Sequence, residues 1–176
     1  VVDKYGNAAS VTSTIETGFG SRVMVGGFLL NNELTDFSFF PDRNGRLIAN
    51  RVQGGKRPRS SMAPTVVLKE GKPFLITGSP GGSRIISYVA RTILNVLEWG
   101  LDPQAAINSG HIVNRNGVTE LEEETDAINL KEGLESLGHK VKIRNLNSGL
   151  HSILFAQDGT LIGAADPRRE GLVMGE

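Results

Sequence analysis

The chain contains a glycine-rich stretch whose backbone could bind negative charge. Residues 78–83 (GSPGGS) lie between an apolar run and a segment with helical periodicity, so the N–H groups of Gly81 and Gly82 would precede a helix. N–H groups in such a position can stabilise an oxyanion or bind a phosphate. The phosphate-loop motif requires a lysine and a hydroxyl residue after its last glycine, whereas Ser83 and Arg84 stand there. An oxyanion site and a plain tight turn therefore remain as alternatives.

Serine hydroxyls offer a second kind of chemistry. Ser60 and Ser61 precede an expected strand that begins after Pro64. Two adjacent hydroxyls either cap the local backbone or hydrogen-bond an oxygen-bearing ligand, and the sequence leaves both readings open. Ser79 does not lie in a G-x-S-x-G motif, so the sequence does not favour it as the nucleophile of a Ser-His-Asp triad.

Three carboxylates form the third candidate. Glu16 ends one apolar segment, and Glu33 and Asp36 follow another at a spacing of i and i+3. Acids in this pattern are usually solvated, but three converging carboxylates would bind an ammonium ion. The basic residues of the stretch 56–59 (KRPR) are expected to face solvent rather than to neutralise these acids.

Composition narrows the function classes. The 176 residues carry 19 basic and 19 acidic side chains, and a net charge of zero argues against a nucleic-acid-binding protein. The chain has no cysteine and only three histidines without metalloprotease spacing, so we expect no metal site and no cofactor. Its length fits a single domain over residues 1–176. Because it begins with Val1 rather than Met, we expect a piece of a longer protein.

Three hairpins are predicted by strands that flank acidic or glycine-containing turns. They comprise residues 1–16 around a turn at 4–7, residues 65–78 around Glu70 and Gly71, and residues 152–166 around 157–159. Together they predict a largely antiparallel sheet.

Helices are predicted between these hairpins. Residues 83–99 have apolar residues near a 3.6-residue period with Ser83 as N-cap, residues 102–109 begin with an Asp-Pro pair, and residues 126–139 end near Gly138. We expect two packed helices on one face of the sheet. Residues 39–59 are predicted to form a long irregular loop, a feature that is often functional.

The matching motifs, taken together, resemble the small subunit of γ-glutamyltranspeptidase, a member of the N-terminal nucleophile hydrolases. KRPRSSMAPT followed by TGSPGGSRI is the most specific part, and LLNNELTDFS and GAADPRREG also match in order. The resemblance implies an α+β fold, a four-layer αββα sandwich completed by a large subunit from the same precursor. It also implies an acyltransferase and amidohydrolase whose nucleophile is an N-terminal threonine freed by autocleavage.

The resemblance also implies roles for individual residues. Thr14 matches the threonine that hydrogen-bonds the nucleophile, and Gly81 and Gly82 match the oxyanion hole. The remaining matches bind the γ-glutamyl group: Glu16, Glu33 and Asp36 its α-ammonium, and Ser60 and Ser61 its α-carboxylate. Expected substrates are glutathione or other γ-glutamyl compounds, with water, amino acids or peptides as acceptors.

Two departures from the family pattern bear on these expectations. The family's Thr-Thr-His-like start is absent, so we expect the nucleophilic threonine a few residues upstream of Val1. Residues 37–59 are of a length that varies in the family and are expected to form a shortened lid. Rival interpretations are an acylase similar to cephalosporin acylase, a poly-γ-glutamate transpeptidase, or a binding protein without a nucleophile. A periplasmic or extracellular location is implied by the resemblance alone.

Overall fold

The computed structural model describes residues 1–175 and comprises two compact units. The larger unit contains Val1–Thr12 together with the chain from Ser61 onward, and the smaller unit is Ser13–Ser60. The expectation of a single domain over residues 1–176 stays a prediction.

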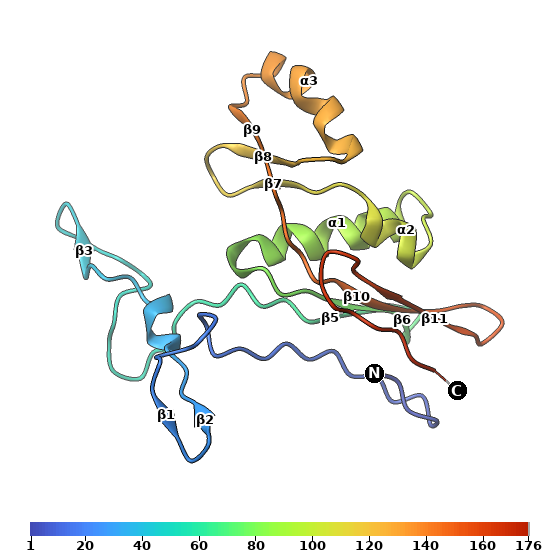
Figure 1. The fold of residues 1–176 in the computed structure, drawn as a ribbon, viewed down its shortest axis with the longest axis horizontal. Helices are drawn as coiled ribbons and strands as arrows, with labels where there is room; N and C mark the ends of the chain where they lie inside the picture. The colour runs from blue at the N-terminus through green and yellow to red at the C-terminus, as the bar shows by residue number, and fades with distance from the viewer. Residues whose placement is uncertain (176) are drawn as a thin grey trace. The chain divides into compact units, whose positions relative to one another are not determined.

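The larger unit is built on a four-stranded antiparallel sheet (Figure 1). Its strand order is β11-β10-β6-β5, with β5 at Thr65–Lys69, β6 at Lys72–Gly78, β10 at His151–Phe155 and β11 at Leu161–Ala165. The hairpins predicted over residues 65–78 and 152–166 are therefore confirmed. Since β6 pairs with both β5 and β10, its apolar run lies at the centre of the sheet, where both faces can be buried.

The turns of these hairpins follow from their residues. Glu70 and Gly71 both have positive φ, at 53° and 78°, as a two-residue hairpin turn of the primed type requires. In the second hairpin Gly159 has a φ of 87°, and the Asp158 carboxylate accepts from the N–H of Thr160. The expected turn chemistry thus sets the register next to each turn, and in β5–β6 an irregularity between Val67 and Leu68 shifts it further along the strands.

Two helices pack on one another and against this sheet, as expected (Figure 1). Helix α1 covers Ile85–Leu97 and helix α2 covers Pro103–Asn108, where Asp102 caps the first turn by accepting from the N–H groups of Gln104 and Ala105. The expected N-cap at Ser83 is wrong. Ser83 lies in a 3-10 turn, η2 at Gly82–Arg84, that precedes α1, and no side chain caps this helix.

The larger unit also has a second, three-stranded sheet that the sequence did not predict. Its strands are β7 (Ile112–Asn114), β8 (Thr119–Glu122) and β9 (Val141–Arg144), and β8 and β9 run parallel. The helix predicted over residues 126–139 is shorter, with a 3-10 turn η3 at Asp126–Leu130 before α3 at Lys131–Ser136. The connection between the parallel strands is thereby supplied by η3 and α3.

The first predicted hairpin does not form as a pair of strands. Residues 1–12 have only an isolated bridge between Val2 and Ala8. Backbone hydrogen bonds still join Val1 with Ala9 and Asp3 with Asn7, and the Asp3 carboxylate accepts from the N–H groups of Tyr5 and Asn7 in the turn between them. With Val1 83% exposed, no burial of apolar surface extends the pairing beyond this bridge.

The smaller unit consists of short elements joined by turns. It contains β1 (Met24–Val25), β2 (Phe28–Leu29), η1 (Glu33–Asp36), β3 (Asp42–Arg43) and β4 (Arg46–Leu47). The predicted irregular loop at residues 39–59 is therefore interrupted by a hairpin whose strands, β3 and β4, have two residues each. Its function as a lid stays a prediction. None of the helices over residues 1–175 is long and apolar enough to cross a membrane.

Candidate functional site

The glycine turn between β6 and α1 presents two adjacent N–H groups without protein partners. Gly81 has a φ of 139° and Gly82 a φ of 59°, and the two carbonyls accept from Arg84 and Ile85. Among residues 1–175, neither glycine's own N–H donates a hydrogen bond. Two unpaired, consecutive N–H groups before a helix can bind an oxyanion.

The ring of a buried tyrosine packs against this turn. A Cβ atom at Gly81 would stand 2.8 Å from Cε2 of Tyr88, a side chain that is 1% exposed. The Tyr88 ring in turn packs on the His111 ring at a centroid distance of 4.2 Å. The backbone can approach the ring this closely only because position 81 carries no side chain.

The segment before the glycines is fixed by a loop from the C-terminal part of the chain. The Ser79 hydroxyl donates to the Pro80 carbonyl at 2.7 Å and accepts from the N–H of Gly149 at 3.2 Å. A Cβ at Gly149 would lie 2.7 Å from Cγ of Pro80. Ser79 is 3% exposed, so its hydroxyl positions the turn and is buried away from any substrate.

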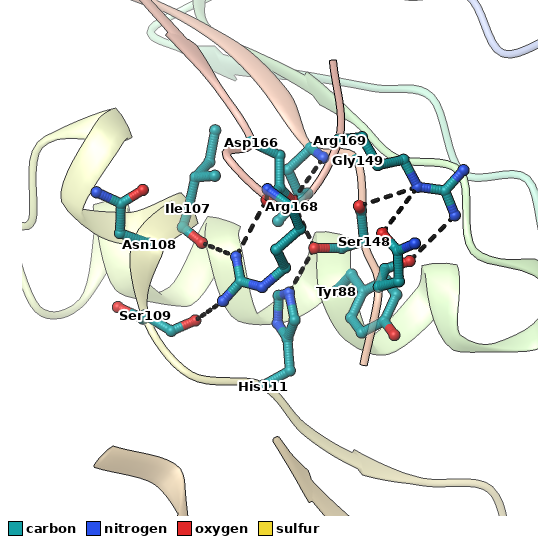
Figure 2. A network of polar contacts seen from close by, with 12 residues as sticks. Tyr88, Ile107, Asn108, Ser109, His111, Ser148, Gly149, Asp166, Arg168 and Arg169 are labelled. Atoms are coloured by element: carbon teal, nitrogen blue, oxygen red, sulfur yellow. Dashed lines mark hydrogen bonds and ion pairs between the residues drawn. The ribbon is translucent and has the colours of Figure 1, made fainter. Parts of the chain in front are cut away.

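A buried polar network holds that loop in place (Figure 2). The Ser148 hydroxyl donates to Oδ2 of Asp166, which also accepts from the N–H of Leu150 at 3.0 Å. Since its single proton goes to Asp166, Ser148 accepts from Nε2 of His111 at 2.7 Å. Burial, and then the positive charge of Arg168, lower the pKa of His111 to about 3, so the imidazole is neutral. The order Asp–Ser–His, with Ser148 fully buried, makes this a scaffold and not a catalytic triad.

Arg168 ties the same network to the second sheet. Its guanidinium forms a two-pronged ion pair with Glu122 on β8, at 2.5 and 2.8 Å, and contacts Oδ1 of Asp166 at 3.1 Å. It also donates to the carbonyls of Ile107 and Ser109 at the end of α2. The DPRR stretch thus joins α2, β8 and the loop below the glycine turn, a role that its sequence did not reveal.

The smaller unit brings the predicted acids together. The Glu16 carboxylate accepts from Nδ2 of Asn32 at 3.1 Å, and the N–H of Glu16 donates to the Thr14 hydroxyl at 2.8 Å. Asn32 directly precedes η1, which carries Glu33 and Asp36. Among residues 1–175, none of the three carboxylates forms an ion pair.

The proximity of these acids affects the pKa of Glu33. Burial raises its pKa, and the negative charges of Asp36 and Glu16 raise it further. Like charges that are close and not neutralised favour either a proton or a cation at the site. This arrangement suits an ammonium group.

Two asparagines without a sequence motif position the candidate binding residues of this unit. Asn32 connects the Glu16 segment to η1. Asn50 donates from Nδ2 to the carbonyl of Asp36 at 2.7 Å and accepts at Oδ1 from the N–H of Arg59 at 3.0 Å. It therefore links the acid turn to the residue before Ser60, and a contact across nine and fourteen residues leaves no local sequence signal.

The predicted site residues are divided between the two units. Thr14, Glu16, Glu33, Asp36 and Ser60 lie in the smaller unit, and the first four are brought together there. Ser61, Gly81 and Gly82 lie in the larger unit, with Ser61 half-buried before β5. Within residues 1–175, no three His, Asp or Glu side chains are placed to hold a metal ion.

Comparison with known proteins identifies relatives over the whole chain. A family model described as Gamma-glutamyltranspeptidase matches residues 1–176. The glutathione hydrolase proenzyme of Escherichia coli is 42% identical over 96% of the chain, and acylase ACY 1 proenzyme from a Pseudomonas strain is 35% identical over 97%. The chain spans 30% of the length of each of these curated relatives.

The fold agrees with solved structures of similar sequence. A mutant γ-glutamyltranspeptidase from Helicobacter pylori superposes with a TM-score of 0.85 at 35% identity, covering 96% of this chain and 97% of that one. A mixed α/β architecture with sheets and few helices is thus shared with that protein.

Proposed function

Because the chain belongs to the gamma-glutamyltranspeptidase family, we propose that it is the small subunit of a γ-glutamyltransferase and glutathione hydrolase. The share of the relatives' length that it covers, 30%, is what a small subunit of a processed precursor would span. Its partner is a large subunit from the same precursor. Together they form a four-layer αββα sandwich, in which the larger unit supplies a sheet and its helices.

The proposed reaction passes through an acyl-enzyme. The hydroxyl of a threonine preceding Val1 attacks the γ-carbonyl carbon of the donor and its proton passes to the α-amine of that threonine, giving a tetrahedral oxyanion. The C–N bond then breaks, and the leaving amine takes up the proton. Water or an acceptor amine attacks the resulting ester, which returns the hydroxyl and releases glutamate or a new γ-glutamyl amide.

The observation that carries this proposal is the pair of unpaired N–H groups at Gly81 and Gly82. A tetrahedral intermediate develops negative charge on the former carbonyl oxygen, and two fixed donors stabilise it without reorganisation. The buried support from Tyr88 and Ser79 keeps these donors in place. Thr14 is proposed to hydrogen-bond the nucleophile.

The donor's amino-acid end matches the remaining candidates. Glu16, Glu33 and Asp36 would bind the α-ammonium, because they are close together and form no ion pair within residues 1–175. Ser60 and Ser61 would bind the α-carboxylate through their hydroxyls. An amino acid or peptide is the proposed acceptor alongside water, and a periplasmic or extracellular location is proposed from the family alone.

The acid assignment is tested with two donors on the complete processed protein. One is γ-glutamyl-p-nitroanilide, and the other is glutaryl-p-nitroanilide, which lacks the α-ammonium. In Asp36→Asn, kcat/KM for the γ-glutamyl donor should fall about 10- to 100-fold, the effect of one charge-assisted hydrogen bond. The glutaryl donor should change much less. Asp42→Asn, an exposed acid of the same unit, is the matched control and should change neither rate.

Other outcomes would select a rival function. A wild-type preference for the glutaryl donor would indicate an acylase, a rival function suggested by the similarity to acylase ACY 1 proenzyme. Preference for a poly-γ-glutamate donor would indicate a capsule-type transpeptidase. Binding of glutamate without turnover of any donor would indicate a binding protein, and equal losses on both donors in Asp36→Asn would overturn the ammonium assignment.

A further inference from the structure

A single buried carboxylate in the larger unit is surrounded by three arginines. Glu120 on β8 accepts from Nε and Nη2 of Arg84 at 2.6 and 2.9 Å. Arg144 on β9 contacts Oε1 of Glu120 at 2.8 Å, and Arg115 from the β7–β8 turn contacts it at 3.4 Å. These four residues are called the arginine cluster below.

The arginine cluster carries more positive charge than its own carboxylate balances. Glu120 is the one acidic partner of all three arginines among the ion pairs of residues 1–175. Hydrogen bonding to Arg84 lowers the pKa of Glu120 to about 2 despite its burial, so it stays ionised and two positive charges remain in excess. Arg115 and Arg144 are 42% and 43% exposed, so their guanidiniums have donors free for an anion.

The cluster adjoins the glycine turn. Arg115 donates from Nη1 to the hydroxyl of Ser83 at 2.6 Å, and Ser83 follows Gly82 directly. Standard backbone dimensions therefore place the guanidinium of Arg115 within about 10 Å of the Gly82 nitrogen.

This separation matches the length of a dipeptide. Two extended residues span about 7 Å, and a hydrogen bond of about 2.9 Å at each end extends their reach to about 13 Å. An amine half of two residues, with its scissile carbonyl at the glycine turn, can thus place its terminal carboxylate against the arginine cluster. A planar carboxylate is the group that guanidinium donors fit best.

We propose that Arg115 and Arg144 bind the terminal carboxylate of the leaving amine, the cysteinyl-glycine half when the donor is glutathione. This inference rests on the proposed function, because it assigns a further subsite to the same reaction. Arg84 and Glu120 hold the two binding arginines in position. The site selects donors whose amine half ends in a carboxylate.

The test compares three donors on the complete processed protein. They are glutathione, its C-terminal glycinamide analogue and γ-glutamyl-p-nitroanilide, of which only the first carries a carboxylate in its leaving group. The wild-type kcat/KM should be higher for glutathione than for the glycinamide analogue. In Arg115→Gln and in Arg144→Gln this preference should fall about tenfold, as expected for one charge-assisted hydrogen bond.

Controls separate the site from bulk charge and from folding. Lys142→Gln removes an exposed positive charge that lies opposite Glu120 in the strand register but forms no ion pair with it among residues 1–175, and should keep the wild-type preference. Turnover of the anilide reports that each variant is folded. If the arginines had a purely structural role, their substitution would lower turnover of all three donors by the same factor. If they contact the substrate carboxylate, only glutathione turnover should fall.

Three results would overturn the inference. These are equal losses on all donors, an unchanged preference in both arginine variants, or a wild-type protein that does not distinguish glutathione from its glycinamide. If the wild-type protein turned over no γ-glutamyl donor, the proposed function would fail, and the inference with it. Failure of the subsite alone leaves γ-glutamyl-p-nitroanilide turnover intact, so the two failures are distinguishable.

Discussion

The two glycines of the proposed oxyanion turn should respond differently to the same substitution. At Gly81, φ is 139°, and an added Cβ would lie 2.8 and 3.2 Å from two atoms of the buried Tyr88 ring. At Gly82, φ is 59°, and an added Cβ meets nothing within 4 Å. Gly81→Ala and Gly82→Ala therefore form a matched pair, in which the composition change is identical and only the local geometry differs.

The magnitudes follow from that geometry. A residue other than glycine at the Gly81 conformation costs about 1–3 kcal/mol of backbone strain, and overpacking against Tyr88 adds about 1–3 kcal/mol. We therefore expect Gly81→Ala to lower the free energy of unfolding by about 2–6 kcal/mol. Gly82→Ala requires only a left-handed helical conformation, which costs about 1 kcal/mol.

The effect on turnover should follow the same order. Relief of the overlap at position 81 must move either the ring or the turn, and a displaced oxyanion donor costs on the order of 10²-fold in kcat. Gly82→Ala keeps both N–H groups and their support, so kcat should change by less than about fivefold, a limit set by the strain of about 1 kcal/mol.

The assay combines urea unfolding of the complete processed protein with initial rates on γ-glutamyl-p-nitroanilide. Equal stability losses in the two alanine variants would refute the packing argument about Tyr88. A folded Gly81→Ala protein with wild-type kcat would refute the role of this turn in catalysis. A large kcat loss in Gly82→Ala alone would indicate that the geometry of residue 82, and not of residue 81, is critical for catalysis.

Two further predictions concern buried and positioning groups. His111 takes up a proton at about pH 3 in the folded chain, against 6.5 for a free histidine, so the unfolded state binds the additional proton as the pH falls below 6.5. The free energy of unfolding should therefore drop by about 2 kcal/mol between pH 7.5 and 5 through this group. This loss should disappear in His111→Gln and persist in His151→Gln, a control at an exposed position. An identical pH profile for the wild type and His111→Gln would contradict the prediction. Asn50→Ala breaks the link between Asp36 and Arg59, and should raise KM for γ-glutamyl-p-nitroanilide about tenfold with little change in kcat, whereas an unchanged KM would remove Asn50 from the positioning residues.

Local sequence patterns determined the elements whose energetics are local. The hairpins β5–β6 and β10–β11 were predictable because their turns need residues that tolerate positive φ, and Glu70–Gly71 and Gly159 provide them. The cap of α2 was predictable because an aspartate before a proline satisfies the first N–H groups of a helix. The candidate residues Gly81 and Gly82 were visible for the same reason, since few residues can form such a turn.

Local pattern failed where exposure or distant packing partners, rather than intrinsic preference, decided the structure. The first hairpin has suitable strand residues, but its pairing is limited to a short bridge around the Asp3 turn, and Val1 stays exposed. The buried face of α1 includes Thr92 and Asn95, while the apolar Ile86 is 59% exposed. In α1, burial against partners far along the chain outweighs intrinsic preference.

The sequence by itself determined the family resemblance, the antiparallel hairpins and the identity of the candidate binding residues. Only the tertiary structure decided that the N–H groups of Gly81 and Gly82 are unpaired and that Asn50 joins the acid turn to Arg59. It also decided that Glu120 gathers three arginines beside the glycine turn. The contacts of Asn50 and of Glu120 span 5 to 36 residues, from Arg115–Glu120 to Arg84–Glu120, and hydrogen bonds over such varied separations follow no periodicity that a sequence displays.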